Sequence, residues 1–200
     1  MNPFEMLHND HVAAQGLLKD LINIGEKASR KERMQMLNLI EREVKIHTAL
    51  EEKIFYPALR KAAEDKGDKD LVYDAVEEHD AVDKLLPELK LLALKKDGSF
   101  EAKVRLADKL VNQHIELEEE QMFPRMKEII AEEKLEQIGE KMTDEKEKLF
   151  KSWKGMIRGP LHRGKTLVDA VTPLAAKEVR VKARAKTKTT KRPARAKTHR

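Results

Sequence analysis

The 200-residue chain contains no cysteine, which excludes disulfides, thiolate metal sites and a catalytic thiol. Any metal ion must therefore be held by nitrogen and oxygen ligands. Aromatic residues make up only 4% of the chain, whereas charged residues make up 38%. This balance is typical of long helices that carry many ion pairs, and it argues against a β-sandwich or a β-barrel.

Long apolar runs are also missing. No stretch approaches the roughly 20 apolar residues that a membrane-spanning helix needs. Residues 1–8 lack the cationic start and the apolar run of a signal peptide. We therefore expect a soluble, cytoplasmic protein with no membrane partner.

The net charge of +5 is unevenly distributed along the chain. Residues 177–200 contain eleven Lys or Arg and a single acid, Glu178, so this segment carries +10 and the rest of the chain carries −5. A segment of Lys, Arg, Ala and Thr cannot bury a core, so we expect a disordered basic tail. Its cationic side chains suit sequence-independent binding to nucleic acid, although a solubilising role accounts for them equally well.

Apolar residues recur at helical spacing in four long segments. These run from a cap at Asn2 to Gly25, from about Ser29 to the polar residues 64–68, from there to the residues before Asp97, and onward from a cap at Ser99. Short connections between them imply an all-α, up-down-up-down antiparallel four-helix bundle. A fifth helix is expected from about Glu132 to Lys154. The predicted organisation is a bundle with this docking helix in residues 1–157, a linker or short helix in 158–176, and the tail in 177–200.

Thirteen residues of the chain occur twice. Residues 47–59 and 114–126 both place Leu three, Glu four, Glu five, an aromatic residue nine and Pro ten residues after a histidine. Another acid–His pair precedes each copy, at positions 10–11 and 78–79. The repeat indicates an internal duplication, and its prolines, Pro57 and Pro124, are expected to bend or end their helices.

Each half of the repeat places two histidines and one glutamate on the inner stripe of its helices. The six residues are His11, His47, Glu51, His79, His114 and Glu118. A glutamate four residues after a histidine lies on the same side of a helix. Burying two unpaired carboxylates costs several kcal/mol each, and a pair of divalent cations removes that cost. A lone inward histidine is commonly a hydrogen-bonded core residue. Six such residues at matching positions of the two halves instead predict a metal site suited to iron, manganese or zinc.

These residues resemble the hemerythrin-like (HHE cation-binding) family over about residues 3–155. The two His-x2-Leu-Glu-Glu segments, each followed by an aromatic residue and proline, carry the resemblance. It implies that the four histidines are terminal ligands of two non-haem iron ions, cycling between Fe²⁺ and Fe³⁺, and that Glu51 and Glu118 bridge them. Dioxygen, peroxide or nitric oxide would bind at an open position. The ferritin-like alternative requires Glu-x2-His pairs, which are absent at the corresponding places.

The chain departs from the oxygen-carrying hemerythrins at two positions. Their third helix has a second histidine where this chain has Asp83, and their fourth helix has an aspartate where this chain has Glu119. We favour Glu118 as the ligand because it matches Glu51 in the repeat. Asp83, Glu119 and His8, which lies one turn before the first ligand histidine, are further candidates. A carboxylate-rich site favours redox turnover over reversible dioxygen carriage.

Three functions are compatible with the sequence. The first is a di-iron protein that binds dioxygen or decomposes peroxide in the manner of a catalase or peroxidase. The second is a redox or iron sensor. The third is a nucleic-acid-associated stress or regulatory protein that is tethered by residues 177–200, with the metal site as its sensor.

Overall fold

The structure, a computed structural model, describes residues 2–63, 66–95 and 98–156 of the chain. Within these ranges the elements are all helical and no strand is present, which confirms the all-α prediction. The described residues belong to one compact unit. The linker or short helix predicted for 158–176 and the basic tail predicted for 177–200 lie outside the described residues.

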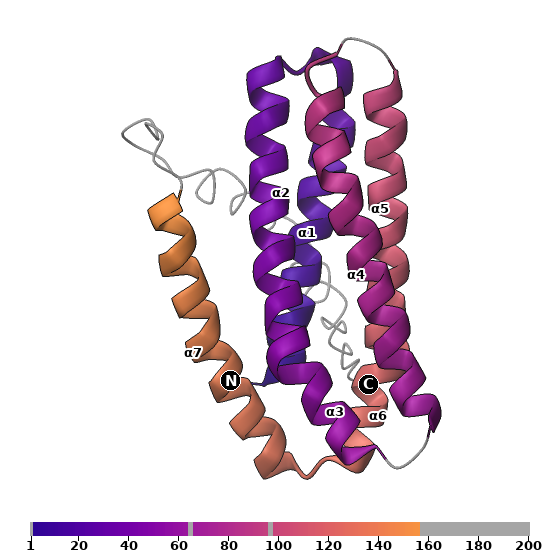
Figure 1. Cartoon of the computed structure of the whole chain (residues 1–200), viewed down its shortest axis with the longest axis vertical. Coiled ribbons are helices and arrows are strands. Elements are labelled where there is room, and N and C mark those ends of the chain that lie inside the picture. The colour runs from indigo at the N-terminus through magenta and orange to yellow at the C-terminus, as the bar shows by residue number, and fades with distance from the viewer. Residues whose placement is uncertain (1, 64–65, 96–97, 157–200) are drawn as a thin grey trace, which may run out of the picture. The chain divides into compact units, whose positions relative to one another are not determined.

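Four long helices lie side by side (Figure 1). They are α1 (Pro3–Ile24), α2 (Arg30–Leu50), α4 (Lys66–Leu92) and α5 (Ser99–Leu117). Helices α1 and α4 each pack against both α2 and α5. Successive helices run in opposite directions through short connections, which is the up-down-up-down arrangement of a four-helix bundle.

The helix starts follow local capping chemistry. The side chain of Asn2 accepts hydrogen bonds from the backbone N–H groups of Phe4 and Glu5 at the start of α1. Ser29 and Glu32 form a capping box at the start of α2. The cap expected at Ser99 is wrong by one residue, because Ser99 begins α5 and Gly98 takes the cap position. Gly98 has no side chain to accept a hydrogen bond, so the following turn begins without a side-chain cap.

The helix ends also explain the short connections. Gly25 ends α1 with a φ of 40°, a conformation that other L residues rarely adopt. A 3₁₀ turn, η1 (Gly25–Lys27), then leads into α2.

The repeated prolines widen their helices and do not end them. Helix α2 continues through a π-helical turn, η2 (Glu51–Phe55), into α3 (Tyr56–Ala62), and α5 continues through η3 (Glu118–Met122) into α6 (Phe123–Ile129). Proline lacks an N–H group and its ring clashes with the carbonyl four residues earlier in an α-helix. In each π turn a backbone N–H instead bonds five residues back, from Tyr56 to Glu51 and from Phe123 to Glu118.

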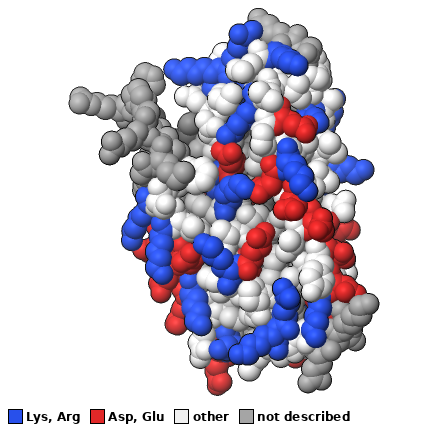
Figure 2. Space-filling model, in the orientation of Figure 1, with Lys and Arg blue, Asp and Glu red and all other residues white. Residues whose placement is uncertain are grey.

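The fifth helix, α7 (Glu132–Met156), packs against α1 and α2. Its buried residues Leu135, Ile138 and Met142 join the main apolar core. That core fills the end of the bundle at which the π turns, α3 and α6 lie. Lys and Arg side chains are interspersed with Asp and Glu on the face shown in Figure 2. In the part of the chain that the structure describes, no helix has both the length and the apolar character that crossing a membrane requires.

Candidate metal centre

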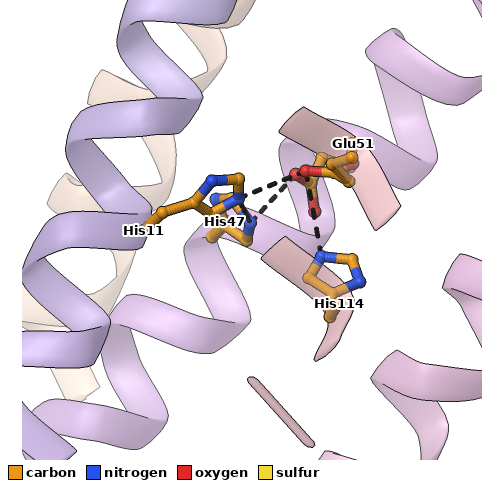
Figure 3. Close-up of side chains that lie close together, drawn as sticks. His11, His47, Glu51 and His114 are labelled. Carbon is orange, nitrogen blue, oxygen red and sulfur yellow. Dashed lines mark hydrogen bonds and ion pairs between the residues drawn. The ribbon is translucent and has the colours of Figure 1, made fainter. Parts of the chain in front are cut away.

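Five buried side chains of the repeat bring potential ligand atoms within 4.8 Å of one another. They are His11 from α1, His47 from α2, His114 from α5, and Glu51 and Glu118, the first residues of the two π turns. Figure 3 shows the imidazole nitrogens of His11, His47 and His114 turned toward carboxylate oxygens. π-Helical turns frequently lie at functional sites, and these two place each glutamate one turn beyond a histidine.

His79 of α4 adjoins this group and completes two pairs of histidines. Its Nε2 lies 3.3 Å from Nε2 of His114, and Nε2 of His11 lies 3.2 Å from Nε2 of His47. The structure therefore brings together all six residues that the sequence singled out. The centre consists of a His11–His47 pair and a His79–His114 pair.

Each glutamate reaches both pairs. Oε1 of Glu51 lies 2.9 Å from Nε2 of His47, and its Oε2 lies 3.2 Å from Nε2 of His79. Oε2 of Glu118 lies 3.2 Å from Nε2 of His11 and 3.8 Å from Nε2 of His114. The two carboxylates thus lie between the histidine pairs.

The two buried carboxylates need a positive charge nearby to compensate for their loss of solvation. The side chains of Glu51 and Glu118 are 0% exposed, and none of their four oxygens has a hydrogen-bond partner in the structure. Burying an ionised carboxylate without compensation costs several kcal/mol, and native proteins rarely leave such atoms unsatisfied. Imidazole nitrogens and carboxylate oxygens together suit transition-metal ions. The donor set is therefore that of a buried metal-binding site.

Electrostatics couple the glutamates and histidines. Burial alone would raise the pKa of Glu51, but the charge of His47 and the nearby imidazole of His79 hold that pKa well below its usual value. Burial alone would lower the pKa of His47, but Glu51 and Asp10 raise it to about 10. The pKa of His79 is raised as well, because Glu51 and Glu52 outweigh its burial. In the metal-free protein the proton on His47 compensates the carboxylate of Glu51.

A second carboxylate faces the other ring nitrogen of each of the four histidines. Nδ1 of His11 donates to Glu119 at 2.7 Å and Nδ1 of His79 donates to Glu52 at 2.9 Å. These contacts place a proton on Nδ1 and leave Nε2 for a metal ion. Glu119 and Glu52 occupy matching places in the repeat, one residue after Glu118 and Glu51 respectively.

The remaining two histidines face the acids that precede the first histidine of each half. Nδ1 of His114 lies 3.3 Å from Oε2 of Glu78, whereas Nδ1 of His47 lies 3.8 Å from Oδ2 of Asp10. The pKa of Asp10 is lowered because His47 and the Lys146 ammonium group outweigh its burial. Sequence periodicity alone did not assign these orienting roles, although the repeat places all four acids next to a predicted ligand.

The aromatic position of the repeat differs between the halves. Tyr56 stacks on His79 with ring centroids 5.7 Å apart, and Phe123 stacks on His11 with centroids 6.1 Å apart. Only the tyrosine adds a polar group, and its Oη lies 3.4 Å from Nε2 of His79. Burial, together with the charges of Glu51 and Glu118, raises the pKa of Tyr56 well above its usual value, so the phenol stays protonated. The motif showed an aromatic residue here, but it gave no sign of this contact.

The three further candidates lie around the six central residues. Asp83 forms an ion pair with Lys45. His8, whose side chain is 56% exposed, lies 2.9 Å from Oε1 of Glu119. Glu119 holds His8 and His11 together, and these interactions lower its pKa despite partial burial. Glu119 therefore contacts the metal-binding group through His11.

A small cavity adjoins the imidazole rings. Its volume is about 40 Å³, enough for a molecule of about two or three heavy atoms. The four histidines line it together with an apolar residue one turn from each of them: Ala14, Val44, Val82 and Val111. The centre therefore has a narrow, largely apolar space beside it.

The model of the hemerythrin HHE cation-binding domain family matches residues 2–126. The chain belongs to this family, as its repeated histidine and glutamate motifs predicted. The matched range includes the whole metal centre and ends before α7. No curated protein and no solved structure matches the chain significantly.

Proposed function

We propose that the protein is a non-haem di-iron protein that reacts with a small oxidant or gas, with the His11–His47 and His79–His114 pairs each holding one ion. The observation that carries the proposal is the placement of Glu51, which contacts one histidine of each pair through separate oxygens. One carboxylate can then ligate two ions at once. Glu118 also reaches one histidine of each pair from the opposite half, but through a single oxygen, Oε2.

Iron is the ion that best combines this donor set with redox chemistry, although manganese and zinc accept the same ligands. When bound, iron supplies the electrons for reduction of dioxygen or peroxide. The protein supplies the ligands and fixes their orientation through the carboxylates on Nδ1. It also keeps bulk water away, because the bridging glutamates are fully buried and the histidines nearly so.

The surroundings of the centre favour a very small ligand. The cavity of about 40 Å³ excludes larger substrates and admits dioxygen, peroxide or nitric oxide. Tyr56 provides a protonated hydroxyl beside the His79–His114 pair. It can donate a hydrogen bond or a proton to a ligand bound there, which is a common contribution of a positioned acid to catalysis.

Anaerobic loading with Fe²⁺ tests this proposal. Peroxide or dioxygen is then added while optical spectra and remaining peroxide are followed. Disproportionation of many equivalents of hydrogen peroxide to water and dioxygen supports an enzyme, and a single stoichiometric oxidation supports a sensor or store. An unchanged spectrum with both oxidants would refute the proposal.

A second candidate function rests on composition. Residues 177–200 carry eleven basic side chains and one acidic side chain, a density that suits contacts with phosphates. We propose that this tail tethers the metal-binding domain to nucleic acid. Retention of the full chain and of a 1–176 truncation on double-stranded DNA should be compared across a salt series. Equal retention of both proteins would refute the tether, whereas a loss of salt-sensitive binding on truncation supports it.

A further inference from the structure

The two halves of the metal centre differ at one orienting carboxylate. Asp10 and Glu78 occupy equivalent places in the repeat, but Asp10 lies 3.8 Å from Nδ1 of His47 and Glu78 lies 3.3 Å from Nδ1 of His114. The first distance is beyond hydrogen-bonding range and the second is within it. The Nδ1 atom of His47 therefore lacks the carboxylate hydrogen bond that orients the ring of His114.

The second partner of each carboxylate accounts for this difference. Nζ of Lys146 donates to both oxygens of Asp10, at 2.5 and 2.6 Å. Glu78 instead accepts a hydrogen bond from the neutral side-chain amide of Gln113, at 2.9 Å. Both contacts involve a carboxylate, but only Lys146 adds the attraction of a full positive charge, so Lys146 competes with His47 for Asp10 more effectively than Gln113 competes with His114.

Lys146 also changes the charge beside one pair of histidines. Its ammonium group offsets the negative charge of Asp10, whereas Gln113 leaves the charge of Glu78 uncompensated. The side chains of Lys146 and Asp10 are 23% and 16% exposed, so solvent screens this ion pair less than a surface pair. A carboxylate bonded to the far nitrogen of a ligand imidazole fixes the orientation of the ring, and a carboxylate that is held by an ammonium group does so less.

Lys146 belongs to α7, which follows the residues that the family model matches. The helix is fixed to the bundle by its buried apolar residues Leu135, Ile138 and Met142. Another α7 ion pair, Glu145 with Lys53 at 3.3 Å, does not involve an orienting carboxylate. Loss of the Glu145–Lys53 ion pair therefore serves as a control, because it affects the docking of α7 without affecting Asp10 or Glu78.

We propose that Lys146 is a positioning residue that acts through Asp10 on His47 and makes the two metal positions unequal. The position at His11 and His47 binds a divalent cation more weakly than the position at His79 and His114. This inference rests on the proposed two-ion centre and assigns to α7 a role in tuning it.

Titration of the full-length, metal-free protein with Co²⁺, followed by its visible absorption, tests the proposal. Two binding steps with distinct dissociation constants are expected. Lys146→Met should tighten the weaker step by about tenfold, because released Asp10 can bond His47. Lys146→Arg should keep the two steps apart, and Lys146→Gln, which keeps a donor without charge, should fall between Met and Arg.

Two further variants separate positioning from stability. Glu145→Gln removes the ion pair between α7 and Lys53 and should leave both steps unchanged. In an Asp10→Asn background, Lys146→Met should no longer alter the weaker step, because its effect passes through the Asp10 carboxylate. The same Co²⁺ spectra report whether the coordination of the weaker site changes with the affinity.

The outcomes distinguish this inference from the proposed function. Two equal steps in the wild-type protein, or equal effects of Lys146→Met and Glu145→Gln, would overturn the role of Lys146 while leaving a two-ion centre intact. Fewer than two bound ions would overturn the two-ion centre itself. If Lys146→Met does not fold, the Gln and Arg variants provide the same comparison.

Discussion

Glu51 and His79 come from different helices of the bundle, yet Oε2 of Glu51 lies 3.2 Å from Nε2 of His79. Its other oxygen lies 2.9 Å from Nε2 of His47, on the same helical run as Glu51 itself. A single carboxylate therefore connects the two histidine pairs. The predictions below follow from this connection and from the groups that support it.

Replacing Glu51 by Gln should reduce the number of bound divalent ions from two to one or fewer per chain. The substitution keeps the size of the side chain but removes the charge that two ions share. Elemental analysis after anaerobic loading and desalting measures the effect. Glu52→Gln is the matched control, because Glu52 lies on the same π turn and orients His79 without facing the ions. It should keep two ions and weaken their binding by about 10–100-fold. Two tightly held ions in Glu51→Gln would contradict the bridging role.

Removing metal should destabilise the protein. At free metal about 1,000 times above its dissociation constant, binding adds about 4 kcal/mol to the free energy of unfolding. For a domain of this size that corresponds to a rise in Tm of roughly 8–16 °C. Thermal unfolding followed by circular dichroism, with and without a chelator, checks this value. A Tm that is insensitive to the chelator, in protein shown to contain metal, would argue against a buried site.

Metal binding should release protons at neutral pH. In the metal-free protein the pKa of His47 is raised to about 10, so the imidazole is charged at pH 7 and must lose its proton to ligate. A raised pKa stabilises the metal-free fold fully below about pH 6.5, and this stabilisation disappears as the pH rises through about 10. Metal affinity should therefore increase with pH across this window.

Calorimetric titration with Mn²⁺ in two buffers of different ionisation enthalpy measures the proton release. The observed binding enthalpy should differ between the buffers by an amount that corresponds to at least one proton per chain. Identical enthalpies in both buffers would show that the histidines are already neutral before metal binds.

Tyr56→Phe should slow the reaction of the iron-loaded protein with peroxide by at least about tenfold, because it removes a positioned proton donor. The fold and the metal content should not change, since the repeat already places phenylalanine at the equivalent position 123. Stopped-flow absorption measures the rate. Tyr73→Phe, which alters the other tyrosine of the chain, is the control because Tyr73 is 54% exposed. Equal rates for all three proteins would remove Tyr56 from the proposed chemistry.

The helical class and the inward placement of each of the six central side chains could be predicted because each depends on a single helix at a time. A period of 3.6 residues places His47 and Glu51 on one face, and the repeat shows that the second half does the same. The capping residues Asn2 and Ser29 identified two helix starts for an equally local reason. Helical periodicity and capping residues can be recognised without knowing which helices pack against one another.

Contacts between helices could not be predicted in this way. Nothing local indicates that Lys146 meets Asp10, because the two lie 136 positions apart and the match depends on how α7 docks. His8 and Asp83 also lie near predicted ligands in sequence, yet their side chains bond to Glu119 and Lys45. The π turns were missed because proline signals a disturbed helix without specifying its form.

The most direct test of the account is a crystal structure of the iron-loaded protein with anomalous data collected at the iron edge. Two anomalous peaks are expected, one at the His11–His47 pair and one at the His79–His114 pair, with the Glu51 carboxylate contacting both. A single peak, or two peaks that do not share Glu51, would contradict the central claim.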